Sequence, residues 1–181
     1  MKTGLVILVL LVIVAAAGGQ YTSLRKGLAA ERAAIDVLWT QVEAAFDHRD
    51  EILPELEQAV AGEAPKEAAA VKAVTDARAA LRATKGRAPK IQANARVDNA
   101  VARLMLCVEG YPRLDGSAKY SDLLEALKDA DYRIAVARRK YNEAVEHYNT
   151  RIALFPHNVV ARLAAFGKID AYIQTPPEPR P

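Results

Sequence analysis

The chain has 181 residues, and its 25 basic and 22 acidic residues give a net charge of +3. Because charges of both signs are interspersed along the chain, this small excess does not indicate a nucleic-acid-binding protein. Hydrophobic residues make up 51% and aromatic residues 6%, which favours closely packed helices over a sheet core. Cys107 is the single cysteine, which excludes an intrachain disulfide and a thiolate metal cluster. We therefore expect one all-α domain with an appendage.

An uncharged run from Thr3 to Leu24 follows Lys2 and predicts a single-pass membrane anchor over residues 1–24. A helix needs about 20 residues to cross a hydrocarbon core of about 30 Å, and this run is long enough if residues 18–21 lie in the interfacial layer. The alternative is a secretory signal peptide cleaved before Gly18. The flanking charges leave open on which side of the membrane the bulk domain lies. The apolar residues that form the anchor are Leu5, Val6, Ile7, Leu8, Val9, Leu10, Leu11, Val12, Ile13 and Val14.

Apolar residues keep a three-four spacing from Tyr21 to Phe46, which predicts a helix that continues the N-terminal run as one rod. Gly27 costs such a helix about 1 kcal/mol relative to alanine and is the expected hinge. Pro54 cannot donate a backbone hydrogen bond, so we expect it to kink the helix or to make it restart near Asp50.

Breakers divide the rest of the chain into further helices. A fourth helix begins at Ser117 or Lys119, and Pro156 ends it. The proline-rich tail over residues 168–181 should be extended. Four long helices joined by short turns predict an antiparallel four-helix bundle over residues 25–167. The other expected elements are a turn over residues 62–65, a helix over 68–83, a break over 84–89, a third helix over 91–108, a loop over 113–118 and a short helix over 158–166.

The stretch from Asp131 to Pro156 carries the longest apolar stripe. Its three-four spacing places Tyr141, Tyr148 and Phe155 on one buried helix face that is about seven turns long. The dipeptide Tyr-Asn occurs in it twice, seven residues apart. The stretch contains the pattern A-R-x-x-Y-N-x5-Y-N-x5-F-P, formed by Ala137, Arg138, Tyr141, Asn142, Tyr148, Asn149, Phe155 and Pro156.

This pattern resembles the C-terminal signature of the LemA family. Two further stretches resemble the family, and the likeness covers roughly residues 21–167. The chain departs from the family at Glu55, where asparagine is more frequent. The resemblance implies a retained N-terminal transmembrane helix that leads into the helical domain. The residues that carry the two further stretches include Trp39, Gln41, Arg49, Pro54, Tyr111 and Pro112.

Motifs for common chemistry are missing from the sequence. It contains no Gly-rich phosphate loop, no G-x-S-x-G and no H-E-x-x-H, so we expect no catalytic residues, no cofactor and no metal. Glu143 and His147 are four residues apart, and we interpret them as a solvated contact, not as half of a bundle metal site. The run over residues 138–140 is interpreted as an exposed basic face; the alternative is a site for phosphate or lipid headgroups.

Several polar and aromatic residues lie on the predicted seams. We expect Trp39 to be a core residue, with a ligand pocket as the alternative. Tyr141 and Tyr148 should be buried, and the candidate partners of their hydroxyls are Asp36, Gln41 and Arg49. Asparagine is disfavoured within helices, so we interpret Asn142 and Asn149 as buried residues whose interhelical hydrogen bonds fix the register. Ligand contact and plain exposure are the alternatives.

Two functions remain compatible with these patterns. The first is a non-catalytic, membrane-anchored scaffold or adaptor of the bacterial cell envelope, with other envelope proteins as partners and an open oligomeric state. The family resemblance adds a membrane zinc metalloprotease as a candidate partner, because its gene often lies beside LemA genes. The second is a small-ligand sensor or an enzyme, and whether its polar residues surround a cavity discriminates the two. The residues expected to converge in that pocket are Asp36, Arg49, Arg138, Asn142 and Asn149.

Overall fold

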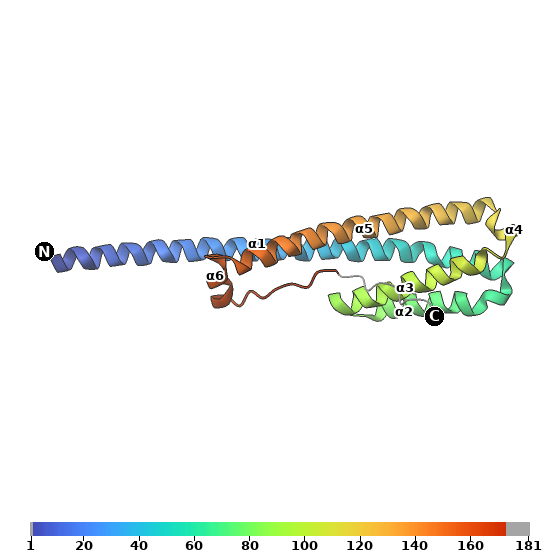
Figure 1. The fold of residues 1–181 in the computed structure, drawn as a ribbon, viewed down its shortest axis with the longest axis horizontal. Coiled ribbons are helices and arrows are strands. Elements are labelled where there is room, and N and C mark those ends of the chain that lie inside the picture. Colours follow the sequence, from blue (N-terminus) through green and yellow to red (C-terminus); the bar gives the residue numbers. More distant parts are fainter. Residues whose placement is uncertain (1, 173–181) are drawn as a thin grey trace. The chain divides into compact units, whose positions relative to one another are not determined.

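The protein is seen in a computed structural model that describes residues 2–172, with the backbone alone described at residues 2–6, 8, 9, 13 and 115. Regular structure in this part of the chain is entirely helical, which confirms the predicted all-α class (Figure 1). The elements are α1 (Lys2–Glu63), the short 3-10 helix η1 (Pro65–Glu67), α2 (Ala68–Ala83), α3 (Arg87–Val108), α4 (Pro112–Asp115), α5 (Ala118–Ala153) and α6 (His157–Leu163).

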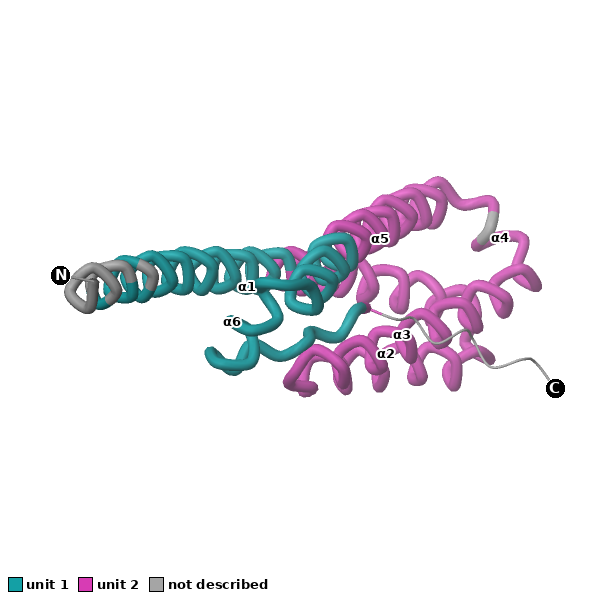
Figure 2. Tube along the Cα trace, turned by 60° about the vertical axis from the view of Figure 1, so that its left-hand side comes forward, with its two compact units in different colours: residues 1–38, 141–171 teal, residues 39–140, 172–181 magenta. Residues whose placement is uncertain are grey.

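The chain divides into two compact units (Figure 2). Unit 1 consists of residues 1–38 and 141–171, which include the first part of α1, the last part of α5 and α6. Unit 2 consists of residues 39–140 and of the chain from Tyr172 onward. It contains the second part of α1, the elements from η1 to α4, and the first part of α5. The boundaries after residues 38 and 140 fall within helices, so α1 and α5 each contribute to both units.

Helix α1 is continuous over 62 residues, as expected of one rod. It includes Pro54, so of the two predicted alternatives the restart near Asp50 is wrong, whereas the kink stays a prediction. A proline inside a helix costs about 3 kcal/mol, but Leu53 and Leu56 on either side of it are each 1% exposed, and their burial offsets that cost. Tertiary packing of an apolar face therefore outweighs the local propensity of this segment.

Helices α2 and α3 form a hairpin in unit 2. The predicted bounds of α2, residues 68–83, are confirmed. Helix α3 begins at Arg87, earlier than the predicted residue 91, because Pro89 lies in the first turn, where a backbone N–H has no intrahelical partner. Gly86 makes the turn at a φ of 90°, a conformation that favours glycine.

The core of unit 2 is an apolar seam along its helices. Trp39 is 7% exposed, which confirms it as a core residue. Tyr111 precedes Pro112, the first residue of α4, as expected for the end of the preceding helix. The large apolar residues buried in this unit include Val42, Phe46, Leu53, Leu56, Val60, Val74, Leu81, Ile91, Val97, Leu104, Val108, Tyr120, Leu127 and Ile134.

Unit 1 pairs the first part of α1 with the last part of α5. Leu28 and Ile35 of α1 are buried, and so are Tyr141 and Tyr148 of α5, as predicted. Phe155 was predicted to end this buried stripe, but it is 81% exposed, and that prediction is wrong. The physical reason is that α5 ends at Ala153, so the helical periodicity no longer applies two residues later.

The expected transmembrane anchor falls partly outside the described side chains. Those of Leu5, Val6, Leu8, Val9 and Ile13 are not described, whereas those of Ile7, Leu10, Leu11, Val12 and Val14 are 56% to 67% exposed. Among the described residues, no helix combines the length and the apolar character that crossing a membrane requires. The anchor is thus not confirmed. At the other end, residues 173–181 of the predicted extended tail lie outside the described residues.

Candidate functional site

A pocket of about 560 Å³ opens in unit 2. One residue of α1, five residues of α3, seven residues of α5 and Tyr172 form its walls. Its volume lies within the roughly 300–1,000 Å³ that is typical of small-molecule sites. The lining residues are Arg49, Asn94, Asp98, Val101, Ala102, Met105, Leu124, Leu127, Lys128, Asp131, Ile134, Ala135, Arg138 and Tyr172.

Arg49 is the centre of the polar part of this pocket. Its side chain is buried at 4% exposure, and a buried cation requires charged or polar partners. Nη1 donates to Asp98 Oδ1 at 2.5 Å and to Asp131 Oδ1 at 3.2 Å, and Nη2 donates to Asn94 Oδ1 at 2.6 Å. The guanidinium thus ties α1 to α3 and to α5, and it uses its planar set of donors to do so.

Tyr172 extends this network from the C-terminal segment. Asn94 Nδ2 donates to the Tyr172 hydroxyl at 3.1 Å, and the Arg138 guanidinium carbon lies 5.6 Å from the centre of the Tyr172 ring. Burial, together with the negative charge of Asp98, raises the pKa of Tyr172 to about 12. The phenol is therefore neutral at physiological pH and remains a hydrogen-bonding anchor for the end of the described chain.

Polar and apolar side chains line different parts of the pocket along α3, whereas on α5 they alternate. On α3, Asn94 and Asp98 come first, and Ala102 and Met105 follow toward the end of the helix. Met105 Sδ accepts a hydrogen bond of 3.3 Å from the Tyr120 hydroxyl of α5. The lining therefore combines apolar surface with an ion-pair network, a composition typical of small-molecule sites.

A second buried ion cluster lies elsewhere in unit 2. Arg78 of α2 is 6% exposed, and its Nε donates to Asp50 Oδ1 at 2.6 Å. Its Nη1 donates to Glu57 Oε1 at 2.8 Å, and its Nη2 donates to the Asp50 carbonyl at 2.9 Å. These partners neutralise the cation and fasten α2 to α1. Because none of the three residues lines the 560 Å³ pocket, the cluster is structural.

The tyrosines of the Tyr-Asn motif form hydrogen bonds within unit 1. The Tyr141 hydroxyl donates to the Asp170 carbonyl at 2.9 Å, and the Tyr148 hydroxyl donates to the Gly167 carbonyl at 3.2 Å. Both hydroxyls thus donate to backbone carbonyls of the segment after α6, which the predicted candidate partners Asp36, Gln41 and Arg49 did not include. The prediction considered only charged or polar side chains on helices. The backbone carbonyls of an irregular segment also need hydrogen-bond donors, because they have no partners within a helix.

Asn149 binds that same segment through both ends of its amide. Nδ2 donates to the Ile169 carbonyl at 2.8 Å, and the Ile169 backbone N–H donates to Asn149 Oδ1 at 3.0 Å. Its role is therefore structural, but it joins a helix to an extended segment and not, as predicted, a helix to a helix. Asn142 and Asn149 are both half-buried on this helix, so neither has the full burial that was predicted.

The five residues expected to converge are distributed over the two compact units. Arg49 and Arg138 line the pocket of unit 2. Asp36, Asn142 and Asn149 belong to unit 1. Sequence reasoning missed Asn94, Asp98, Asp131 and Tyr172. The signal that could have found the first two is their i, i+4 spacing beside the apolar seam of the third predicted helix. Of the remaining motif residues, Gln41 is exposed, and the Tyr111 hydroxyl donates to Glu67 Oε1 at 3.0 Å.

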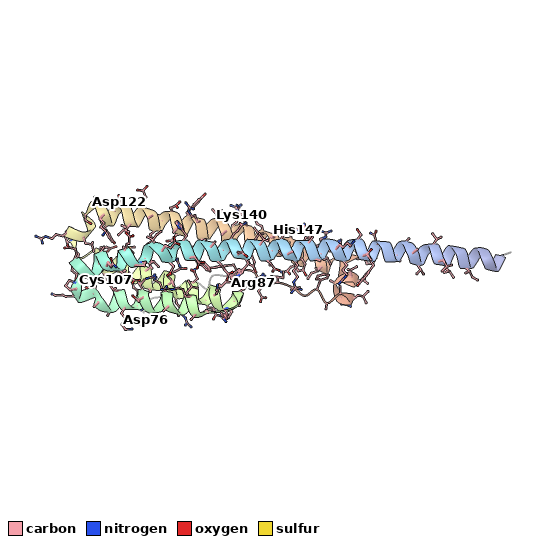
Figure 3. The ribbon with its side chains drawn as sticks, turned by 180° about the vertical axis from the view of Figure 1, so that it is seen from behind. Asp76, Arg87, Cys107, Asp122, Lys140 and His147 are labelled. Carbon is pink, nitrogen blue, oxygen red and sulfur yellow. The ribbon has the colours of Figure 1, made fainter. Side chains whose placement is uncertain are left out.

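Candidate metal ligands are scattered over the part of the chain that the structure describes. No group of three or more His, Cys, Asp or Glu side chains could hold a metal ion there. His147 is exposed on α5, whereas Cys107 lies on α3, which belongs to unit 2 (Figure 3). A hydrogen bond with Glu67 raises the pKa of the Cys107 thiol, which disfavours the reactive thiolate.

The features above define an all-helical protein with buried arginine networks and a pocket that combines apolar and polar side chains. The chain belongs to the LemA family, whose model matches residues 38–180. Over 78 residues it is 33% identical to magnetosome protein MamQ 2 of Paramagnetospirillum magneticum and 31% identical to magnetosome protein MamQ of Magnetospirillum gryphiswaldense. Each match covers 43% of this chain and 29% of the relative, so the chain matches less than a third of the length of these proteins.

Proposed function

We propose that the protein is a non-catalytic adaptor of the bacterial cell envelope, a four-helix antiparallel bundle held at the membrane by residues 1–24. The observation that carries this proposal is the apolar N-terminal part of α1. The large apolar side chains described there, from Ile7 to Val14, are more than half exposed. A helix that is apolar on all sides requires an apolar surrounding, and lipid supplies it.

The character of the pocket supports the absence of catalysis. Its lining contains no serine, cysteine or histidine, the residues that most often serve as nucleophile or general base. Its two carboxylates, Asp98 and Asp131, both bond to the Arg49 guanidinium, so each already has a cationic partner. Exposed helix faces remain as the means of interaction, and other envelope proteins are the proposed partners, with a membrane zinc metalloprotease as the candidate that the family resemblance implies.

The test compares three versions of the protein in membrane fractions. The full chain should sediment with membranes, resist extraction by high salt and dissolve in detergent. A chain that begins at Arg25 should remain in the soluble fraction. Leu10→Arg should weaken insertion, because an arginine at the centre of a span costs about 2.5–3.5 kcal/mol on insertion scales. Val37→Arg, at an exposed position of α1 outside the run, is the matched control. A full chain that high salt releases, or a mature chain that begins at Gly18, would overturn the proposal.

Binding of a small ligand is the second candidate, favoured by the size of the pocket and its lining by Arg49 and Arg138. The two methionines allow a direct test, because Met105 lines the pocket and Met1 belongs to the proposed anchor. With isotope-labelled methionine methyl groups, a ligand should shift the Met105 resonance and leave that of Met1 unchanged. Ala102→Trp, which fills the pocket from an exposed position of α3, should abolish the shift. A panel of metabolites that leaves Met105 unmoved would reject this candidate.

A further inference from the structure

The end of α5 and the outer face of α6 expose a group of large apolar side chains in unit 1. Leu154 is 59% exposed, Phe155 81%, Val159 48% and Leu163 71%. These four residues are hereafter the apolar corner. Val159 and Leu163 are four positions apart and share one face of α6, whereas Val160 and Ala161 on the other face are buried. A short helix that is apolar on its outer face as well as its inner face is unusual for a surface in water.

The apolar corner lies at the level of α1 where the uncharged run ends. Arg151 of α5 forms an ion pair with Glu31 of α1, and a Cβ built on Gly27 would lie 3.8 Å from Arg151 Nη2. Arg151 Nε also lies 3.0 Å from Nε2 of His157, the first residue of α6. These contacts place the start of α6 beside Gly27. Figures 1 and 2 both show α6 beside α1, with the N-terminal part of α1 extending beyond it.

The distance to the proposed span is short. Leu24, the last residue of the uncharged run, precedes Gly27 by about 4.5 Å along the helix axis. If residues 1–24 cross a membrane, the apolar corner therefore lies at the membrane–water interface. The charges around it fit that position, because Arg25 and Lys26 on α1 and Arg162 on α6 are exposed. Cations next to an interface attract anionic lipid headgroups, by about 1 kcal/mol each near the surface.

We propose that the apolar corner inserts into the interfacial layer of the same membrane that holds the N-terminal helix, with lipid as its partner. The corner provides a second, monotopic contact next to the single span. Phe155 and Leu163 enter the boundary between headgroups and acyl chains, and Arg162 remains at headgroup level. This inference rests on the proposed membrane anchor. Contact with lipid would explain why the aromatic side chain of the motif residue Phe155 is exposed. A second contact with the membrane would also restrict the tilt of unit 1 relative to the bilayer.

Site-directed fluorescence on the full chain tests the proposal. In a Cys107→Ser background, single cysteines replace Phe155, Val159, Val12 or Val37, and each carries an environment-sensitive fluorophore. Val37 is the matched control, because it is 60% exposed on the same unit but about 20 Å along α1 from Leu24. The labelled chains are reconstituted in phosphatidylcholine vesicles with and without phosphatidylglycerol. Quenchers are attached to the lipid chains or dissolved in water.

Lipid-attached quenchers should remove most of the emission at positions 155 and 159, as they do at position 12, while the aqueous quencher acts at position 37. Phe155→Glu combined with Leu163→Glu should make position 159 accessible to the aqueous quencher and leave position 12 unchanged. If the aqueous quencher acts at positions 155 and 159 while the lipid-attached quenchers act at position 12, the apolar corner does not contact lipid, and the proposed anchor is unaffected. Protection from both quenchers would also overturn the proposed lipid contact, since a protein would then cover the corner. A chain that does not float with the vesicles would overturn anchor and corner together.

Discussion

Asn149 and Ile169 are joined by a pair of hydrogen bonds that satisfies both backbone groups of Ile169. Asn149 Nδ2 donates to the carbonyl at 2.8 Å, and Asn149 Oδ1 accepts from the N–H at 3.0 Å. In a β-sheet, a neighbouring strand forms the same two hydrogen bonds with one residue. The single Asn149 side chain therefore provides the pairing that an isolated extended segment otherwise lacks. The adjacent hydroxyls of Tyr141 and Tyr148 bind two further carbonyls of the same segment.

Replacing Asn149 by alanine should release this segment. The change leaves the N–H and the carbonyl of Ile169 without their partner, which should cost about 1–3 kcal/mol, offset by a few tenths from the better helix propensity of alanine. Hydrogen exchange at the Ile169 amide and urea unfolding in detergent measure the two effects. Thr150→Ala, at the next and exposed position of α5, is the control and should change neither. An unchanged or raised melting temperature in Asn149→Ala would show that the pairing does not stabilise the fold.

Replacing Arg78 by alanine should be among the most destabilising changes in unit 2. It leaves the carboxylates of Asp50 and Glu57 largely buried without their cation, and breaking a buried ion pair costs about 3–5 kcal/mol. Arg82→Ala is the matched control on the same helix, because Arg82 is 60% exposed and its Nε lies 3.4 Å from Asp50 Oδ2. That exposed pair should contribute no more than about 1 kcal/mol. Urea unfolding of both variants decides; equal effects would contradict the assignment of Arg78 as a buried anchor.

The fold could be predicted where local signals and tertiary packing agree. Helix α2 was located correctly because Pro65 precedes it, at the start of η1, and a break at Gly86 follows it. The helix boundary predicted at Pro54 was partly wrong. The free-energy cost of a proline inside a helix suggests a boundary there, but the buried residues beside Pro54 keep α1 continuous. A single sequence contains the penalty but not the packing energy that offsets it.

The candidate site was less predictable. The family pattern identified Arg49 and Arg138, but the acceptors of Arg49 lie on helices that begin 38 and 69 residues after it. Their pairing depends on how those helices are rotated against each other, which hydrophobic periodicity fixes only approximately. Asp98 shares a seam with Val97 in the sequence pattern, so its inward direction was ambiguous. Tyr172 lies in an irregular segment, where periodicity gives no information.

Gly86 and Gly62 should respond in opposite ways to alanine. Gly86 has a φ of 90°, so a Cβ there is strained, and Gly86→Ala should destabilise the α2–α3 hairpin by about 1–2 kcal/mol. Gly62 is helical in α1, and a Cβ there would meet no atom within 4 Å, so Gly62→Ala should stabilise by about 0.5–1 kcal/mol. Urea unfolding of the two variants measures the difference. A stabilising Gly86→Ala would mean that the turn adopts another conformation.

Tyr172 should make the stability of unit 2 sensitive to alkaline pH. Its pKa is raised from 10.0 to about 12, chiefly by burial, so the folded state holds the phenolic proton more tightly than the unfolded state does. Stability from this group is therefore fully present below pH 10 and is lost as the pH rises toward 12. The loss should approach about 2–3 kcal/mol, since one pKa unit corresponds to about 1.36 kcal/mol.

Unfolding free energies between pH 9 and about pH 12, measured on matched variants, isolate this contribution. Tyr172→Phe should remove its part of the slope, at a cost of about 1 kcal/mol below pH 10 for the lost hydrogen bond from Asn94. Tyr132→Phe is the control, because Tyr132 is 67% exposed, and the variant should keep the slope of the unmodified chain. If the slope of Tyr172→Phe equals that of Tyr132→Phe, the ring of Tyr172 is not held in the Arg49 network in solution.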